Sequence, residues 1–147
     1  MLYRFGKVQK LNFSWRRWQI ECLLKRVTDF EKSDDGWLKL RAPGKVNLML
    51  SVHGRRKDGF HELTSLLAPL EFCDELELRK NELTVDTLVI EGIALPVDRS
   101  NLVLQAAQLY RQGTGRSECF DFRLHKRIPI GAGLGGGSSD AVAALKG

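Results

Sequence analysis

The chain has 147 residues, of which 43% are hydrophobic and 28% are charged, a balance that is typical of a globular domain. This composition excludes a disordered, collagen-like or membrane-spanning chain. The formal net charge of +5 favours anionic partners, but it does not select among nucleotides, phosphates and nucleic acids.

The three cysteines, Cys22, Cys73 and Cys119, are far apart and form no C-x-x-C pair, so they predict neither a zinc site nor a disulfide framework. The sequence has no run of about 20 apolar residues and no secretory signal at its start. We therefore expect a cytoplasmic protein.

Residues 1–36 form a basic N-terminal extension, and apolar residues at helical spacing predict a helix over 14–31 that begins at Ser14. Its two tryptophans and its basic side chains would also suit a membrane surface or an organelle-targeting segment, although its acidic residues weaken that interpretation. An appended extension, or a start codon assigned too far upstream, fits equally well. The globular domain is expected over residues 37–147.

Alternating or apolar runs after residue 36 predict a strand-rich region, with a polar turn over 54–59 and a short mixed segment over 61–67. The expected strands span residues 37–41, 46–52, 74–79, 83–90 and 120–125.

One helix is predicted over 101–112, between the strands of the second half. We expect it to begin after Ser100 as the N-cap and to end at Gly113. Its inward-facing residues are expected to be Leu102, Ala106, Leu109 and Tyr110.

The strongest functional pattern is a glycine-rich segment that runs directly into a helix opening at Ser138. Residues without a Cβ let successive backbone N–H groups turn toward one anion, and the N-terminus of a helix favours negative charge there. The hydroxyls of Ser138 and Ser139 can cap the helix or bind phosphate. The sequence therefore predicts a phosphate-binding loop made of Pro129, Ile130, Gly131, Ala132, Gly133, Leu134, Gly135, Gly136, Gly137, Ser138 and Ser139.

This loop does not belong to the common nucleotide-binding types. Gly131, Gly133 and Gly136 satisfy the dinucleotide fingerprint, but Pro129 interrupts the junction between strand and loop. No Gly-Lys-Ser/Thr sequence closes the loop as a Walker A motif would require, and no protein-kinase Val-Ala-Ile-Lys strand is present.

The segment Pro43-Gly44-Lys45-Val46-Asn47 is the second candidate. A lysine that follows a Pro-Gly bend at the edge of an apolar strand can present its ammonium to a phosphate or to a reacting hydroxyl. Asn47 lies two residues further on and shares its face of the strand. Taken alone, the segment would equally suit a solvated lysine and a turn-capping asparagine.

Together, Ala42-Pro-Gly-Lys-Val-Asn-Leu48 and Pro129-x-x-x-Gly-Leu-Gly-Gly-Gly-Ser-Ser-Asp-Ala141 resemble the first two motifs of the GHMP kinases. Gly54-Arg-Arg-Lys-Asp-Gly-Phe-His-Glu-Leu63 and Lys126-Arg-Ile-Pro129 resemble, within that superfamily, the 4-diphosphocytidyl-2-C-methyl-D-erythritol kinases. The resemblance covers residues 38–147, about the first half of such a kinase.

The resemblance implies roles for individual residues. Lys45 matches the active-site lysine, and Asn47 matches a contact to the substrate. Phe60 and His61 match an aromatic–histidine pair that holds cytosine, although without the family His61 would be an ordinary surface or satisfied histidine. Lys126 matches a residue beside the nucleotide and cytidine pockets.

Two further positions, Asn101 and Leu102, match residues near the adenine of ATP. Without the resemblance, Asn101 is a residue of a first helical turn and Leu102 belongs to the core.

The implied reaction transfers the γ-phosphoryl group of ATP, with Mg²⁺, to the 2-hydroxyl of 4-diphosphocytidyl-2-C-methyl-D-erythritol, a step of non-mevalonate isoprenoid synthesis. The implied fold is α+β, resembling ribosomal protein S5 domain 2, with a mixed sheet covered by helices on one side and incomplete at its C-terminus. The family's catalytic aspartate lies downstream of the glycine loop, beyond Gly147, and Asp140 does not match it. We therefore expect the chain as printed to be inactive.

Three alternatives stay open. Another small-molecule kinase of the GHMP type would share Lys45 and the glycine loop without requiring His61 or Lys126. A non-catalytic nucleotide- or RNA-binding fragment would use the basic residues 1–36, and a partial gene product would have no activity.

Overall fold

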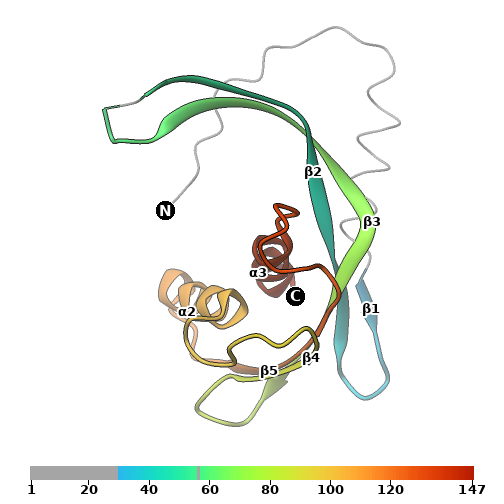
Figure 1. Ribbon diagram of the computed structural model, residues 1–147. Helices are drawn as coiled ribbons and strands as arrows, with labels where there is room; N and C mark the ends of the chain where they lie inside the picture. Colours follow the sequence, from blue (N-terminus) through green and yellow to red (C-terminus); the bar gives the residue numbers. More distant parts are fainter. Residues whose placement is uncertain (1–29, 56) are drawn as a thin grey trace, which may run out of the picture.

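The computed structural model describes residues 30–55 and 57–147, and Figure 1 shows one sheet with two helices in this part of the chain. The strands follow the order β1-β2-β3-β5-β4, and every neighbouring pair is antiparallel except β4 and β5. The sheet is therefore mixed, as the resemblance to the GHMP kinases implied. Its strands are β1 (Phe30–Lys32), β2 (Leu38–Arg55), β3 (His61–Asn81), β4 (Thr87–Gly92) and β5 (Cys119–Lys126).

The β2–β3 ribbon dominates the sheet, with strands of 18 and 21 residues. The sequence predicted separate short strands here, and that prediction is wrong. Pro43 does not end β2 because β1 pairs only with residues 38–40, so Pro43 lies at a sheet edge where proline is tolerated. The pairing shifts register near Pro43, Asn47 and Val52, and such bulges bend a strand, so the outer ribbon curls away (Figure 1).

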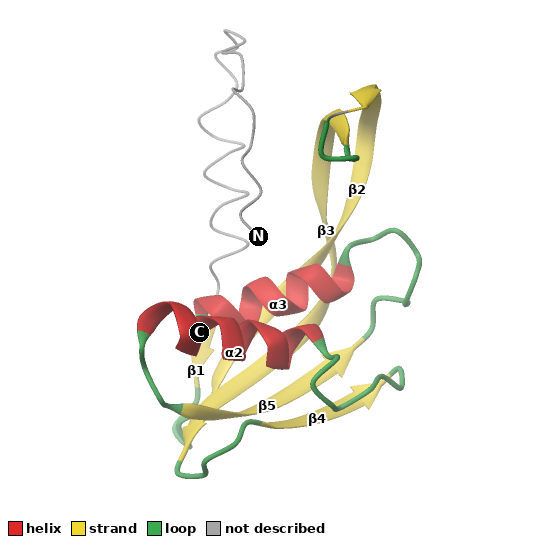
Figure 2. Cartoon of the chain, turned by 90° about the vertical axis from the view of Figure 1, so that its left-hand side faces the viewer, coloured by secondary structure: helices red, strands yellow, loops and turns green. Residues whose placement is uncertain are grey.

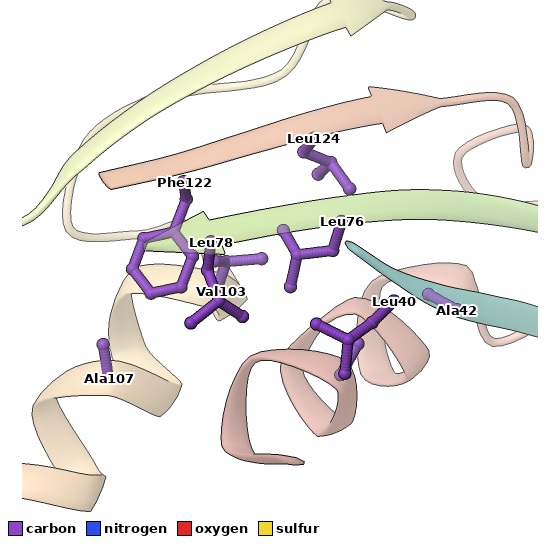
Figure 3. Packing of buried hydrophobic residues seen from close by; sticks show 9 residues of the cluster. Leu40, Ala42, Leu76, Leu78, Val103, Ala107, Phe122 and Leu124 are labelled. Carbon is purple, nitrogen blue, oxygen red and sulfur yellow. The ribbon is translucent and has the colours of Figure 1, made fainter. Parts of the chain in front are cut away.

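Both helices, α2 (Leu102–Thr114) and α3 (Gly136–Lys146), cover the same face of the sheet (Figure 2). This confirms the predicted one-sided arrangement. Figure 3 shows the core between the helices and the sheet, where apolar side chains of five elements meet. The buried cluster consists of Leu40, Ala42, Leu76, Leu78, Val103, Ala107, Phe122, Leu124 and Ala143.

The ends of α2 differ from the prediction. Asn101, and not Ser100, is the N-cap, because its Oδ1 accepts a hydrogen bond from the Val103 N–H at 3.0 Å, while the Ser100 N–H is held by Asp98. The helix continues through Gly113 and ends at Gly115, whose φ of 71° suits a C-terminal glycine.

The inward face of α2 is formed by Val103, Ala106 and Ala107. The sequence placed Leu102 and Leu109 inward, but both are exposed, at 44% and 62%. Of the other two residues expected to face inward, Ala106 is buried and Tyr110 is half-buried.

Helix α3 begins at Gly136, two residues before the predicted opening at Ser138, and Gly135 is its N-cap. Glycine tolerates the left-handed φ of 71° at that position, so part of the glycine run belongs to the helix.

Two further predictions need correction. The strand expected over 83–90 starts only at Thr87, because the Asn81 side chain accepts from the Leu83 N–H and donates to the Val85 carbonyl, which makes a turn. The helix expected over 14–31 is wrong at residues 30 and 31, which belong to β1, and the rest of it lies outside the described residues. The sheet thus includes residues before the expected boundary at 36/37.

Cys73 and Cys119 are free and buried, and Cys22 lies outside the described residues. Within residues 30–55 and 57–147, neither helix has the length and hydrophobicity needed to cross a membrane.

Candidate functional site

The glycine-rich segment forms one wall of a cleft at the C-terminal end of β5. The cleft has a volume of about 440 Å³, which is within the usual range for small-molecule sites. Its lining includes every residue from 129 to 138, together with Asn101, Leu102 and Lys126. The structure therefore brings together most of the residues that the sequence singled out. Ser139 is not part of the lining, and its N–H is bonded to the Gly135 carbonyl at 3.0 Å.

The loop backbone alternates in handedness. Gly131, Gly133 and Gly135 have φ angles of 72°, 72° and 71°, while the residues between them have negative φ. Such alternation turns successive N–H groups toward a common point, where an anion can bind. No heavy atom lies within 4 Å of the place where a Cβ would stand on Gly131 or Gly133, so this part of the loop borders open space.

The three consecutive glycines have a different reason, which is close packing. A Cβ on Gly135 would stand 3.1 Å from Cε of Lys45, and one on Gly137 would stand 3.3 Å from Cδ1 of Leu102. A Cβ on Gly136 would stand 2.9 Å from both Cγ2 of Ile128 and Nζ of Lys126. Each glycine thus lets the chain approach a different element: β2, α2 or the end of β5.

The first turn of α3 borders the cleft, because Gly136, Gly137 and Ser138 are among its lining residues. The N–H groups of Gly136, Gly137 and Ser138 have no acceptor within the helix because of their position in it. The first turn contains no acidic residue, so the partial positive charge of the helix N-terminus is not offset locally. This end of α3 is suited to an anion.

Lys45 ties β2 to the glycine loop. Its backbone N–H donates to the Leu134 carbonyl at 2.8 Å, and its ammonium donates to the Gly133 carbonyl at 2.7 Å and to Asn47 Oδ1 at 3.0 Å. The shared face predicted for Lys45 and Asn47 is confirmed by this last bond. A lysine ammonium thus lies at the rim of the candidate anion site.

A buried ion cluster lies beneath the same loop. The ammonium of Lys126 donates to Asp74 Oδ2 and to Asp140 Oδ2, the latter at 2.7 Å. The side chains of Lys126, Asp74 and Asp140 are only 3%, 0% and 3% exposed. The ammonium of Lys126 is therefore occupied by two carboxylates, although the residue lines the cleft.

The two carboxylates of this cluster are not equally satisfied. Asp74 Oδ1 accepts from the N–H groups of Arg127 at 2.6 Å and Ile128 at 2.8 Å, whereas Asp140 Oδ1 has no hydrogen-bond partner among the described residues. Burial raises the pKa of Asp140 to about 6, and the neighbouring Lys126 only partly offsets this effect.

Asn101 and Leu102 enter the cleft from the start of α2. The side chain of Asn101 is engaged by the backbone, since it caps the helix and donates to the Pro96 carbonyl at 2.9 Å. Leu102 is the partly exposed apolar residue of this wall and contacts Gly137.

Phe60 and His61 are not brought to the cleft. They lie at the tip of the β2–β3 ribbon (Figure 1), where Phe60 is 58% exposed. The Phe60 N–H donates to Asp58 Oδ1 at 3.2 Å, which shapes the turn. Neither residue is part of the cleft lining.

Sequence reasoning did not find Asp74. A pattern that pointed to it exists, because Asp74, Leu76 and Leu78 alternate along β3 and share the buried face. A carboxylate on a core-facing position is rare unless it is paired. What the sequence did not contain was the identity of the hydrogen-bond partners, which are 52, 53 and 54 residues further along the chain.

Comparisons with known proteins agree with this geometry. The family profile "GHMP kinases N terminal domain" matches residues 101–147. The 4-diphosphocytidyl-2-C-methyl-D-erythritol kinase of Deinococcus radiodurans is 50% identical over 104 residues, which are 71% of this chain and 34% of that protein. The Protochlamydia amoebophila protein of that name is 45% identical over 108 residues, 74% of this chain and 37% of that protein.

Solved structures show the same relationship. A crystal structure of 4-(cytidine 5'-diphospho)-2C-methyl-D-erythritol kinase has a TM-score of 0.59 and 46% identity, covering 73% of this chain and 38% of that one. Homoserine kinase from Cytophaga hutchinsonii has a TM-score of 0.56 at 22% identity, covering 80% of this chain and 36% of that one, and so shares the fold.

The sheet covered by two helices, the glycine loop before α3 and the matching profile define the class: the chain belongs to the GHMP kinase superfamily and carries its N-terminal domain. Within that superfamily, it is similar to the N-terminal part of 4-diphosphocytidyl-2-C-methyl-D-erythritol kinases. The chain spans about a third of the length of the curated relatives named above.

Proposed function

We propose that the chain provides the ATP-binding half of a kinase that phosphorylates the 2-hydroxyl of 4-diphosphocytidyl-2-C-methyl-D-erythritol in the cytoplasm, in the non-mevalonate route to isoprenoids. The observation that supports this most strongly is the cleft itself. The glycine loop and the N-terminus of α3 line one space, the Lys45 ammonium is bonded to the loop, and the relatives that share this segment at 45–50% identity are named as that kinase.

The triphosphate would bind to backbone N–H groups. Those of the alternating segment around Gly131 and Gly133 and those of the first turn of α3 supply donors without any reorganisation of side chains. Catalysis of phosphoryl transfer depends mainly on positioning and on stabilising the charge of the transferred group, and a rigid backbone cradle serves both.

Lys45 would act at the reacting end. Its ammonium now holds the Gly133 carbonyl and Asn47, so it is close to the loop and available to stabilise charge on the transferred phosphoryl group. In the reaction, the substrate hydroxyl oxygen forms a bond to the γ-phosphorus, the bond from that phosphorus to the bridging oxygen of ADP breaks, and the hydroxyl loses its proton. We assign the acceptor of this proton to no residue described here, since Asp140 is committed to Lys126.

The remaining contacts divide between the two substrates. We propose that Leu102, with Asn101 holding the start of α2, borders the adenine, and that Asn47 contacts the second substrate. Phe60 and His61 would hold the cytosine from the ribbon tip, where an exposed ring is free to stack on a base. A contact of Lys126 with the substrate stays a prediction from the family.

Mg²⁺ would enter with the triphosphate. Residues 30–55 and 57–147 contain no group of three His, Cys, Asp or Glu residues placed to hold a metal ion. Mg²⁺ in kinases is bound largely by phosphate oxygens and water, so the donor set fits an ion that arrives with ATP. When bound, it would neutralise phosphate charge.

A coupled assay of ADP release tests the proposal. It is run with the chain itself and with the protein encoded by the whole reading frame that contains it. ADP release that depends on 4-diphosphocytidyl-2-C-methyl-D-erythritol is expected from the latter, and Lys45→Met should lower kcat about 100-fold or more. Lys39→Met, which removes a lysine of the same strand that pairs with Glu75 at 2.7 Å, is the matched control and should leave kcat unchanged.

Substrate competition separates the sister kinases. If homoserine, galactose or mevalonate stimulates ADP release and the cytidyl substrate does not, the proposed substrate is wrong while the kinase class stands. If no substrate stimulates ADP release in the complete protein, the kinase proposal itself is overturned.

A further inference from the structure

The buried cluster of Asp74, Lys126 and Asp140 joins three elements that meet under the glycine loop. Asp74 comes from β3, Lys126 from the last position of β5, and Asp140 from the second turn of α3. The side chains are at most 3% exposed. The cluster therefore lies almost wholly inside the protein, under the loop, although Lys126 and Asp140 are among the residues that line the cleft.

Asp74 fixes the start of the loop. Its Oδ1 accepts from the N–H groups of Arg127 and Ile128, and its Oδ2 accepts from the ammonium of Lys126. All three partners are donors. The path of the chain as it leaves β5 is thus set by one carboxylate, which can be replaced by no neutral side chain of the same shape without placing a donor against a donor.

Lys126 and Asp140 fix the end of the loop. The bond from Lys126 Nζ to Asp140 Oδ2, at 2.7 Å, connects β5 to α3. The first residue of the helix packs directly on this ammonium, because a Cβ on Gly136 would stand 2.9 Å from Lys126 Nζ. The position of the α3 N-terminus above the sheet is therefore set by the same lysine.

The charge balance of the cluster does not favour an anion nearby. Two carboxylates share one ammonium, and Asp140 Oδ1 has no partner among the described residues. A surplus carboxylate under a phosphate-binding loop would weaken phosphate binding by simple electrostatics. The presence of this carboxylate is explained if the hydrogen bond that it accepts from Lys126 helps to shape the loop more than its charge opposes phosphate binding.

We propose that Asp74, Lys126 and Asp140 are positioning residues, which hold the glycine loop and the first turn of α3 in the arrangement that binds the triphosphate without touching it. The identity of the ligand rests on the proposed function, whereas the positioning of the loop does not.

The direction in which Asp140→Ala changes the affinity for ATP distinguishes a positioning role from a direct electrostatic effect. Asp140→Ala removes a negative charge near the phosphates and leaves Lys126 paired with Asp74. Electrostatics alone predicts tighter ATP binding, whereas positioning predicts binding about tenfold weaker, the equivalent of one charge-assisted hydrogen bond. Asp140→Asn keeps an oxygen that accepts from Lys126 and should bind ATP nearly as the parent does.

Amide hydrogen exchange measures how stably the loop is held in the absence of any ligand. The N–H of Lys45 is bonded to the Leu134 carbonyl, and the N–H of Ser139 to the Gly135 carbonyl, so both report on the loop and the helix start. Asp140→Ala should speed exchange at these two amides relative to the central strand residue Leu76, and Asp140→Asn should not.

Asp86→Asn is the matched control. It removes a carboxylate that pairs with Arg111 and accepts from the Phe120 N–H at 3.0 Å, far along β5 from the loop. We expect it to lower the Tm by roughly 5 °C and to speed exchange at Phe120, with no change at Lys45 or Ser139 or in ATP affinity. Asp140→Ala should lower the Tm less and yet weaken ATP binding more.

The test is therefore isothermal calorimetry with Mg-ATP and NMR hydrogen exchange on the parent chain and these three variants. The proposal is overturned if Asp140→Ala binds ATP as tightly as the parent or more tightly, or if its Lys45 and Ser139 amides exchange as in Asp86→Asn. If the parent does not bind ATP, the proposed function fails, and hydrogen exchange alone decides on the positioning role. If Asp140→Ala does not fold, Asp140→Ser is measured against the same criteria.

Discussion

The two ends of β5 hold buried carboxylates in different ways. At the first end, Asp86 faces one guanidinium, with Arg111 donating to its two oxygens at 2.9 and 2.5 Å, and the Phe120 N–H adds a third bond. At the last end, Asp74 and Asp140 share the single ammonium of Lys126. One site is balanced in charge and fully bonded, and the other has a surplus carboxylate and an unpartnered oxygen.

We infer that the two carboxylate sites have different roles in the protein. A bidentate pair with a backbone donor closes a corner of the fold between α2, β5 and the turn before β4. A surplus buried charge is a cost that folded proteins tolerate mainly where function requires it. The unbalanced site is the one that lies beside the cleft, which agrees with a role for it in shaping the loop.

The largest effect is expected for Asp74→Asn. The amide oxygen can still accept from the Arg127 and Ile128 N–H groups, but the amide NH₂ would then face the Lys126 ammonium. We therefore expect a loss of about 3–5 kcal/mol in the free energy of unfolding. Urea denaturation of the parent and the variant measures this loss. A loss below that of Asp86→Asn would contradict the view that Asp74 is the anchor of the loop.

Gly136→Ala should cost somewhat less. The new Cβ would stand 2.9 Å from Ile128 Cγ2 and Lys126 Nζ, so helix and sheet must separate, at a cost of about 3 kcal/mol. Gly113→Ala is the control, because it lies within α2 with open space around it and should stabilise the chain by about 0.5–1 kcal/mol. Thermal denaturation of both variants checks the pair, and equal Tm values would refute the packing argument.

Asp86→Asn should lower stability by about 2 kcal/mol, because it weakens charge-assisted bonds at a half-buried guanidinium. ATP affinity should not change. A calorimetric titration that showed weaker ATP binding in this variant would mean that general loosening, and not the cluster near the loop, controls the site.

The smallest effect is a difference in pH dependence. Burial raises the pKa of Asp140 to about 6, so the folded state retains a proton that the unfolded chain releases from about pH 4. This contribution stabilises the fold at pH 4 and disappears as the pH rises through 6. The unfolding free energy of the parent minus that of Asp140→Asn should therefore fall by on the order of 1–2 kcal/mol between pH 4 and 7.

Asp121, near the first end of β5, should behave in the opposite way. Hydrogen bonds from Asn81, Thr87 and Arg79 lower its pKa, so its stabilisation is present above about pH 4 and is lost at lower pH. Urea denaturation at several pH values, with Asp121→Asn as the comparison, measures both slopes. Equal signs for the two aspartates would show that the two ends do not differ as described.

Much of the site was predictable because its residues are close in sequence. The glycine loop, the helix after it and the pair of Lys45 and Asn47 each depend on spacing within a few residues. The loop and the start of the helix line one cleft, and Lys45 is bonded to the loop and to Asn47. The mixed sheet with helices on one side was likewise predicted. The roles assigned to individual residues remain predictions.

The features that could not be predicted from the sequence depend on contacts between segments that are far apart in the chain. Sequence patterns predicted three short strands where β2 and β3 are continuous. The edge position of Pro43 could not be predicted locally, because it depends on how short β1 is. The N-cap of α2 is Asn101 and not the expected Ser100, because the Asp98 side chain accepts a hydrogen bond from the Ser100 N–H. The partners of Asp74 come from the end of β5 and the two residues after it, and no local pattern contains them.

The proposed function depends above all on binding of the ATP triphosphate by the glycine loop. The most direct measurement is an NMR titration of the ¹⁵N-labelled chain with Mg-ATP, following the backbone amides. We expect saturable chemical-shift changes that are largest for the backbone amides of residues 131–138 and of Lys45. Saturation with no change at these amides, or with the largest changes at another face of the sheet, would contradict it.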